Sequence, residues 1–284
     1  MELVMRARTL AGPGPFLMGV VNATPDSFSD GGRYLAAADA IAHGLRLAEE
    51  GADLLDVGGE STRQGSARVP EAEQIARVVP VVEGLRARGL ALPISVDTTR
   101  AAVARAALEA GADLVNDVSG LADDPALGAV VAAAGAGLVL MHMRGSPADM
   151  QSRAVYGDVV AEVAAELRLA LARAAAAGVP AERVVLDPGI GFAKTAAQSV
   201  ELLARVRELG ALGRPLLVGP SRKSFIGQLT GAAVEDRLPG TLAAVTHCVL
   251  AGVELLRVHD VAPARQAARV ARAVRDATRG PDPG

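Results

Sequence analysis

The chain has 284 residues, half of them hydrophobic, so it can bury a core in one large α/β domain or in two small ones. A formal net charge of -3 argues against a protein that coats nucleic acid, because such proteins carry a strong positive excess. The lone cysteine, Cys248, leaves no disulfide framework and no thiolate metal site, which favours a reducing, cytoplasmic compartment.

Eight short runs of β-branched and aliphatic residues recur along the chain, and each one ends in polar residues. They comprise residues 16–22, 54–60, 93–99, 114–120, 138–143, 184–189, 215–221 and 255–260. Alanine-rich segments such as 36–53 and 98–113 separate them, with apolar residues at helical spacing and a glycine near the end. Strands that alternate with helices pair in parallel through right-handed crossovers. We therefore predict the α/β class and a (β/α)8 TIM barrel.

An open doubly wound sheet is the alternative topology, but no GxGxxG sequence follows the first run to support it. We predict a single domain over residues 1–280. Residues 1–15 are expected to be an N-terminal extension that forms a plug or hairpin over the bottom of the barrel. Residues 281–284 are expected to be a flexible tail, because proline and glycine leave little to pack.

The start of the chain does not resemble an export signal, because Arg6, Arg8 and a Gly-Pro cluster interrupt its apolar residues. No later run approaches the ~20 apolar residues of a membrane span. Residues 22–36 and 59–72 are rich in Gly, Ser, Thr and Asp, and we predict that they are mobile lids over the active face.

Polar residues at the carboxyl ends of the strands meet in a TIM barrel, although they are far apart in sequence. The residues at these positions are Asn22, Asp56, Asp97, Asn116, His142, Asp187, Lys223, Arg257 and His259. Neighbours along a strand point to opposite faces, so we assign Asn116 to the pocket and Asp117 to a structural role. Of the other histidines, His43 is expected to face solvent and His247 to pack in the core.

An anion site is predicted where the seventh and eighth runs end. Residues 221–224 lead into a predicted helix, whose first N–H groups can hold an anion together with cationic side chains. Arg257 and His259 follow the eighth run and complete the corner where barrels commonly bind phosphate. Lys223 is one of two lysines, with Lys194, in an arginine-rich chain, and a compact ammonium there indicates a point-charge contact.

Asp97, Asn116 and Asp187 are acceptors aimed inward from three strands, which suits a flat heterocycle with several N–H groups on one edge. The alternative is an internal salt-bridge network in which Lys223 and Arg257 neutralise the carboxylates for stability alone. The chain lacks Gly-x-Ser-x-Gly, His-Glu-x-x-His and Walker sequences, so serine hydrolysis, zinc proteolysis and P-loop transfer have no signature here.

Eight motifs then occur in order: "MGVVNATPDSFSDGG", "GADLLDVGGESTR", "SVDTTR", "NDVSG", "LMHMRG", "DPGIGFAKT", "LVGPSRKSFIG" and "RVHDV". Together they closely resemble the dihydropteroate synthase family from the first strand to the last. The resemblance implies a TIM-barrel transferase of folate biosynthesis that condenses 6-hydroxymethyl-7,8-dihydropterin pyrophosphate with 4-aminobenzoate to 7,8-dihydropteroate and pyrophosphate. It also implies a homodimer, with residues 242–255 among the candidates for the contact, and a target for sulfonamides, which resemble aminobenzoate.

The resemblance also implies roles for individual residues. The pterin would lie against Asp97, Asn116, Met141, Asp187 and Lys223. The pyrophosphate would lie among Asn22, Ser61, Thr62, Arg257 and His259, with Asn22 as the ligand of Mg²⁺. The aminobenzoate and its closing lids would involve Phe28, Asp30, Thr62, Arg63, Phe192 and Ser221, with Asp30 pairing to Arg63 on closure. The catalytic residues would be Lys223, Asp97, Asp187, Arg257 and His259.

The family mechanism would be dissociative: pyrophosphate leaves first, and the neutral arylamine attacks the resulting pterin cation. Three residues depart from the family pattern. Gln64 stands where proline is usual, which frees the backbone of the second lid. Ala193 replaces a usual glycine, and Ser199 stands where asparagine is common; both affect local geometry.

Three rival functions remain open at this point. A methyltetrahydrofolate-dependent methyltransferase would share the acceptors but would have no use for a pyrophosphate site. A non-catalytic relative would bind pterin without turnover, and only Gln64 points that way. A purely structural barrel would not explain polar residues at the same end of so many strands.

Overall fold

A computed structural model describes residues 1–6, 8–23, 32–62 and 65–278 of the chain. Within these ranges, eight parallel strands form one sheet in the order β8-β7-β6-β5-β4-β3-β10-β9. A further parallel bridge joins Leu186 of β8 to Leu216, just before β9, and closes the sheet into a barrel. The predicted (β/α)8 TIM barrel is confirmed, and the open doubly wound sheet is excluded.

The strands match the eight predicted runs; β3 has the predicted bounds, β7 begins one residue earlier, and the others are shorter. They are β3 (Phe16–Asn22), β4 (Leu54–Gly58), β5 (Ile94–Asp97), β6 (Leu114–Asp117), β7 (Gly137–Met141), β8 (Val184–Asp187), β9 (Leu217–Val218) and β10 (Leu255–Val258). The polar residues that follow each strand belong to loops, because the ladder of backbone hydrogen bonds ends where the strands diverge at the mouth.

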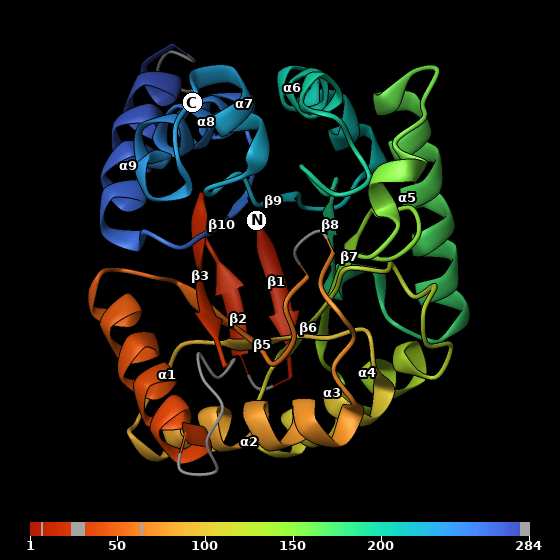
Figure 1. The fold of residues 1–284 in the computed structure, drawn as a ribbon, viewed down its shortest axis with the longest axis vertical. Coiled ribbons are helices and arrows are strands. Elements are labelled where there is room, and N and C mark those ends of the chain that lie inside the picture. The colour runs from red at the N-terminus through yellow and green to blue at the C-terminus, as the bar shows by residue number, and fades with distance from the viewer. Residues whose placement is uncertain (7, 24–31, 63–64, 279–284) are drawn as a thin grey trace, which may run out of the picture.

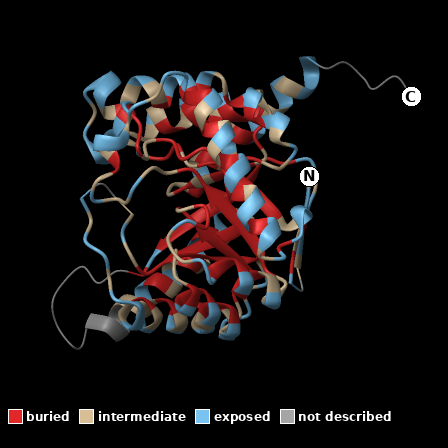
Figure 2. Cartoon of the chain, turned by 90° about the vertical axis from the view of Figure 1, so that its right-hand side faces the viewer, coloured by how far each residue is buried: buried red, intermediate tan, exposed pale blue. Residues whose placement is uncertain are grey.

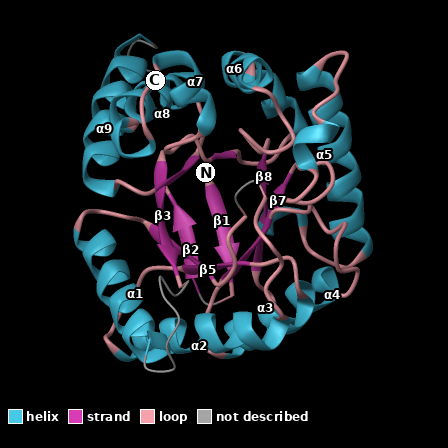
Figure 3. Ribbon diagram, viewed as in Figure 1, coloured by secondary structure: helices cyan, strands magenta, loops and turns pink. Residues whose placement is uncertain are grey.

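Helices surround the sheet, as Figures 1 and 3 show. They are α1 (Gly32–Glu49), α2 (Glu71–Ala87), α3 (Ala101–Glu109), α4 (Leu127–Ala134), α5 (Val159–Ala176), α6 (Ala196–Ala204), α7 (Ser224–Thr230), α8 (Leu238–Ala251) and α9 (Val261–Thr278). Short 3-10 turns lie at η1 (Met150–Arg153), η2 (Ala181–Arg183), η3 (Val206–Leu212) and η4 (Val234–Asp236). None of the helices in the described ranges has the length and apolar character needed to cross a membrane.

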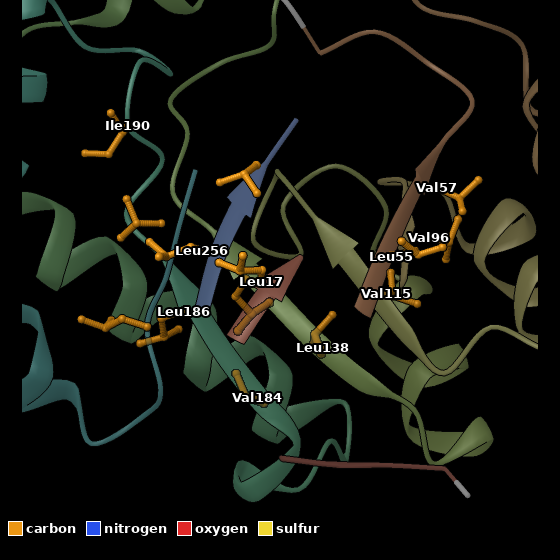
Figure 4. Packing of buried hydrophobic residues seen from close by; sticks show 14 of the residues in the cluster. Leu17, Leu55, Val57, Val96, Val115, Leu138, Val184, Leu186, Ile190 and Leu256 are labelled. Atoms are coloured by element: carbon orange, nitrogen blue, oxygen red, sulfur yellow. The ribbon is translucent and has the colours of Figure 1, made fainter. Parts of the chain in front are cut away.

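The strands are buried on both faces, which is why their sequences read as apolar runs without polar alternation. Figure 2 shows the buried sheet inside a shell of helices whose outer faces are exposed. One set of strand residues, including Leu17, Leu55, Leu138 and Leu186, belongs to the large cluster that packs with the helices (Figure 4). Their neighbours along each strand point into the barrel.

The bottom of the barrel is filled by a second apolar cluster. Inward residues such as Met18, Leu114 and Val139 pack there with Leu3 and Met5. The last two come from an antiparallel hairpin of β1 (Glu2–Met5) and β2 (Arg8–Ala11). The β1–β2 hairpin therefore covers the bottom of the barrel, and the open end is the one that carries the polar residues.

The two predicted lid segments are only partly described, since residues 24–31 and 63–64 lie outside the described ranges. Within residues 59–62 and 65–70 no helix is present. Here Gly65 N–H donates to the carbonyl of Pro147 at 2.9 Å, and Arg68 pairs with Asp123 at 2.7 Å. These contacts tie the second segment to the loops that follow β6 and β7.

Candidate active site

A cavity of about 350 Å³ opens at the carboxyl ends of the strands. The predicted site residues that line it are Asn22, Ser61, Thr62, Asp97, Asn116, Met141, Asp187, Phe192, Ser221, Lys223, Arg257 and His259. Three predicted lid residues, Phe28, Asp30 and Arg63, lie outside the described residues. The structure thus brings together side chains that span residues 22–259 of the sequence.

Strand register explains why these side chains meet. Paired residues of parallel strands project to the same face, and Asp97 pairs with Asn116 while Gly58 pairs with Asp97. Gly58 has no side chain, so the space in front of it stays open to the cavity. Two residues earlier on these strands, Asp56 and Ser95 form the layer beneath.

Asp56 lies under the cavity and is fully buried. Its Oδ2 accepts hydrogen bonds from Arg257 Nε at 2.7 Å and from Asn116 Nδ2 at 3.0 Å. Arg257 Nη2 in turn donates to Asp97 Oδ2 at 3.0 Å. One buried carboxylate therefore fixes the orientation of both an arginine and an amide that line the site. The sequence placed Asp56 among the strand ends but gave it no role.

This network contains two carboxylates, Asp56 and Asp97, but only one guanidinium, that of Arg257. Burial and the nearby Asp56 carboxylate raise the pKa of Asp97, against the opposing effect of Arg257. For Arg257, burial is outweighed by attraction to Asp56 and Asp97, and its pKa is raised. Two carboxylates thus share one guanidinium, so Asp97 gains from any further N–H donor that a ligand brings.

Asp187 and Lys223 form a second group on the other side of the cavity. Asp187 Oδ1 accepts a hydrogen bond from Gly189 N–H at 2.7 Å. Burial raises the pKa of Asp187 to about 6, although the Gly189 N–H and Lys223 lower it. Burial also lowers the pKa of Lys223 to about 8, against the attraction of Asp187. The Lys223 ammonium lies 4.0 Å from the ring centroid of Phe192, a cation–π contact.

The predicted anion corner lies beside this group. His259 Nδ1 is 2.9 Å from Ser221 Oγ, which also accepts from the His259 backbone N–H at 3.2 Å. Burial, then the charges of Arg257 and Arg222, lowers the pKa of His259 to about 4. A ring with this pKa is neutral at neutral pH and has one donor and one acceptor, so with Nδ1 accepting from the Ser221 hydroxyl it would have Nε2 left to donate to an anion. Arg222 is committed elsewhere, since it pairs with Asp260 at 2.5 Å.

The internal salt-bridge alternative holds only for part of the site. Arg257 does pair with Asp56 and Asp97. In the described part of the chain, however, Lys223 Nζ has no hydrogen bond to a carboxylate and faces the cavity. A stability network alone would leave neither an ammonium nor the Asp187 carboxylate at the edge of an open cavity.

His142 was expected among the cavity residues, and this prediction is wrong. Met141 precedes it and points into the cavity, so alternation turns His142 outward, where it contacts Glu166 at 2.9 Å and Lys194 at 2.9 Å. The structural role of Asp117 is confirmed, because its carboxylate accepts from the backbone N–H groups of Ser119 and Leu121.

Two other histidine predictions fail. His247 was expected in the core, but it is exposed and its Nε2 lies 2.9 Å from the carbonyl of Leu203. Helix α8 buries Thr241, Ala244 and Cys248 instead, so His247 falls on the opposite face. His43 was expected in solvent, but it is half-buried, and its pKa is lowered by burial and by Arg46.

Several cavity residues were missed because they lie in loops or turns, where no strand or helix period marks the face that points inward. They are Glu60, Val118, Met150, Gln151, Ile190, Val234 and Arg237.

The two departures from the family pattern near α6 are both accommodated. Ala193 takes a left-handed φ of 48°, at a cost of about 1–2 kcal/mol for a residue with a side chain. Ser199 Oγ donates to the carbonyl of Thr195 at 2.8 Å, inside α6.

A magnesium site built from the protein alone is not present in the described residues, which contain no group of three His, Cys, Asp or Glu side chains placed to hold a metal. Asn22 lies at the end of β3 with its amide exposed to the cavity. Mg²⁺ commonly takes one or two protein oxygens and fills its octahedron with phosphate and water. A single amide oxygen beside an anion site fits that mode of binding.

Fold and site together define a TIM-barrel enzyme with a polar cavity that can hold a flat heterocycle beside an anion. Comparison with known proteins agrees. Residues 18–259 match the family described as "Pterin binding enzyme". The chain is 45% identical over 264 residues to the dihydropteroate synthase of Synechocystis, covering 93% of this chain and 91% of that protein.

Solved structures give the same answer. The chain is 48% identical to the Xanthomonas albilineans dihydropteroate synthase with 4-aminobenzoic acid, with a TM-score of 0.89 and coverage of 96% and 97%. The same enzyme in complex with 7,8-dihydropteroate is matched at 45% identity, with a TM-score of 0.85 and coverage of 96% and 98%. This chain belongs to the dihydropteroate synthases of the pterin binding enzyme family.

Proposed function

We propose that the chain condenses 6-hydroxymethyl-7,8-dihydropterin pyrophosphate with 4-aminobenzoate to give 7,8-dihydropteroate and pyrophosphate. The observation that carries the proposal is the meeting, in one cavity, of three inward acceptors with a lysine and an anion corner. The acceptors are Asp97, Asn116 and Asp187. Relatives of the same family, solved with aminobenzoate and with dihydropteroate, support it.

The pterin would lie between the two groups of the site. Its amino and ring N–H donors match the carboxylates of Asp97 and Asp187, whose pKa values are raised chiefly by burial, so further donors would stabilise their charged forms. Met141 would pack on the ring, because its side chain lines the cavity from the end of β7. Lys223 would offer its ammonium to a ring acceptor.

The pyrophosphate would occupy the corner formed by Asn22, Ser61, Thr62, Arg257 and His259. Arg257 is held by Asp56 and Asp97, so it would present a fixed guanidinium to the anion. The neutral His259 would donate one hydrogen bond. Mg²⁺ held by Asn22 would supply charge neutralisation to the leaving group.

The aminobenzoate would lie near Thr62, Ser221 and the ring of Phe192. Phe192 already covers the Lys223 ammonium, so its ring forms one wall of the cavity. Phe28, Asp30 and Arg63 keep their predicted lid roles as part of this proposal. Sulfonamides, which resemble aminobenzoate, would compete for the same place.

The reaction would proceed by dissociation. The bond between the exocyclic carbon and the pyrophosphate oxygen breaks, and its electron pair leaves with pyrophosphate. The resulting pterin cation is stabilised by the carboxylates of Asp97 and Asp187, which interact more strongly with it than with the neutral ground state. The amine lone pair of aminobenzoate then forms the new C–N bond, and the amine releases a proton. Neither carboxylate has to accept that proton.

The rival functions fit less well. A methyltransferase that uses methyltetrahydrofolate has no need for Arg257 and His259 at an anion corner. A non-catalytic pterin binder would be expected to have lost that corner, and its described residues are in place. We also propose a homodimer through the late helices, supported by apolar side chains that stay exposed on α9, which packs against α8: Val270 at 62% and Val274 at 52%. A cytoplasmic location remains a prediction from the sequence.

The test is a product assay on purified protein with pterin pyrophosphate, run with and without 4-aminobenzoate and Mg²⁺. We expect dihydropteroate and pyrophosphate in equal amounts only when both substrates and Mg²⁺ are present. The Lys223→Ala variant should lose product formation while keeping the fold by circular dichroism. Pterin binding without product in the parent protein would instead favour the non-catalytic binder.

A further inference from the structure

The two lysines of this chain lie on opposite sides of one loop, residues 188–195 between β8 and α6. Lys223 faces the cavity and covers the ring of Phe192. Lys194 is buried behind the loop, with 3% of its surface exposed. Burying an ammonium is costly unless every donor finds an acceptor, so its surroundings should explain why it is there.

Lys194 Nζ has three hydrogen-bond acceptors within reach. They are the carbonyls of Gly189 at 3.1 Å and Phe192 at 2.9 Å, and Nδ1 of His142 at 2.9 Å. Burial lowers the pKa of Lys194 to about 7, against the attraction of Asp187 and Glu166. In its charged form the amine has three donors and no acceptor, so donors and acceptors match one for one, and this match favours the charged form. The planar guanidinium of arginine cannot aim single N–H groups at three acceptors around one point. The site therefore requires a lysine in a chain that otherwise uses arginine.

The contact with Lys194 also fixes the state of His142. Because Nδ1 accepts from the ammonium, the ring is neutral with its proton on Nε2, which then donates to Glu166 at 2.9 Å. Burial, then the charge of Lys194, lowers the pKa of His142 to about 4, which agrees with a neutral ring. Glu166 is held by Arg144 Nε at 2.9 Å, so the chain of contacts ends in an ion pair at the surface.

The loop that Lys194 holds has no regular secondary structure and takes three left-handed residues: Gly189 at φ 68°, Gly191 at 80° and Ala193 at 48°. A side chain at Gly189 would lie 2.1 Å from the carbonyl oxygen of His142, so only glycine fits against the neighbouring strand. Such a segment keeps its shape through contacts outside itself. Two of its carbonyls end on the Lys194 ammonium.

These carbonyls belong to the residues that shape the cavity. Gly189 N–H donates to the Asp187 carboxylate, and Phe192 carries the ring beneath Lys223. We propose that Lys194 is a positioning residue of the synthase, whose buried amine holds this loop so that Phe192 and Asp187 keep their places beside Lys223 in the wall of the cavity. The expected effect of Lys194 on KM rests on the proposed function, whereas its expected effect on the conformation of the loop does not.

The test uses the full chain and compares Lys194→Met and Lys194→Arg with Tyr156→Phe. Tyr156 is a matched control because its hydroxyl donates one neutral hydrogen bond to the same loop, at the Ala193 carbonyl, 2.9 Å away. In both Lys194 variants we expect amide exchange in residues 189–194 to speed up at least about tenfold, and the KM for 4-aminobenzoate to rise about tenfold with a smaller change in kcat. Tyr156→Phe should change both the amide exchange of residues 189–194 and the KM for 4-aminobenzoate by less than about fivefold.

Two results would overturn the proposal. A Lys194→Met protein that melts earlier but keeps the loop exchange and both KM values would give Lys194 a structural role only. Wild-type kinetics in Lys194→Arg would refute the argument from donor geometry. If the variants fail to fold, ¹⁵N spectra of the parent protein still decide, because His142 must be neutral with its proton on Nε2 at neutral pH. A parent protein without product would refute the proposed function, yet the exchange and ¹⁵N measurements would still test the loop.

Discussion

Replacing Asp56 by asparagine tests the network beneath the cavity most directly. The change keeps the size of the side chain but removes the charge that accepts from Arg257 at 2.7 Å and from Asn116 at 3.0 Å. A hydrogen bond to a charged group contributes about 1.5–3 kcal/mol. Both donors end on Oδ2, so the amide oxygen of asparagine would accept from them without the charge, and its nitrogen would replace Oδ1, which is buried without a hydrogen-bond partner. We therefore expect the free energy of unfolding to fall by about 3 kcal/mol, the lower end for breaking a buried ion pair.

The size of the chain converts this loss into a melting temperature. An unfolding entropy of about 2.1 cal/mol/K per residue amounts to roughly 0.6 kcal/mol/K for the whole chain, so Tm should fall by about 5 °C. Arg257 would also lose one of its two anchors. We expect kcat/KM to fall roughly 100-fold, which is typical when a preorganised donor to developing negative charge is lost. Thermal unfolding by circular dichroism and a steady-state assay measure the two effects.

Asp117 provides the matched control. It is also fully buried, on β6, two strands away from Asp56 on β4, but its carboxylate points away from the cavity and accepts from Ser119 and Leu121. Asp117→Asn should cost comparable stability while leaving kcat/KM within about threefold of the parent. Equal losses of activity in both variants, or a stable and active Asp56→Asn protein, would refute the assignment of Asp56 to the support of Arg257.

Three further outcomes are expected. Asp97 has a pKa of about 7 and Asp187 a pKa of about 6, and pterin donors favour the charged form of each, so the affinity for a pterin without pyrophosphate should be full above about pH 7, fall about tenfold per unit below it and fall more steeply below about pH 6; a flat calorimetric profile from about pH 5 to pH 8 would contradict this. Arg257→Lys should lower kcat/KM at least about tenfold, because one ammonium cannot reach both Asp56 and Asp97; unchanged kinetics would count against the paired geometry. Asn22→Ala should raise the Mg²⁺ concentration for half-maximal activity by roughly 10-fold, and an unaltered titration would remove Asn22 from the metal site.

The site was predicted well from the sequence wherever strand alternation decides to which face a side chain points. Asp97, Asn116 and Asp187 end buried strands, and strand alternation turns each into the barrel, so their meeting follows from the fold. The same rule, applied to consecutive residues, would have separated Met141 from His142, because only one of two neighbours can face inward. That error came from an incomplete use of the pattern.

Other features depend on contacts that no local pattern encodes. Asp56 looks like any strand-end carboxylate in sequence, and its role appears only when Arg257, 201 residues later, lies beside it. Lys194 was noticed as a rare lysine, but its three acceptors are two carbonyls of its own loop, Gly189 and Phe192, and the ring of His142, which follows β7. The loop residues Glu60 and Gln151 reach the cavity through turns whose direction is set by tertiary packing.

The barrel is joined least firmly between β8 and β9, where a single bridge at Leu186 and Leu216 links β8 to a strand of two residues. Asp187 stands on one side of that joint, and Lys223 follows the strand on the other. A pterin bound by both residues would connect the two strands through its own contacts, so binding in the cavity and closure of the barrel would stabilise each other. Substrate would then hold the barrel closed at the place where the pairing of backbone strands is weakest.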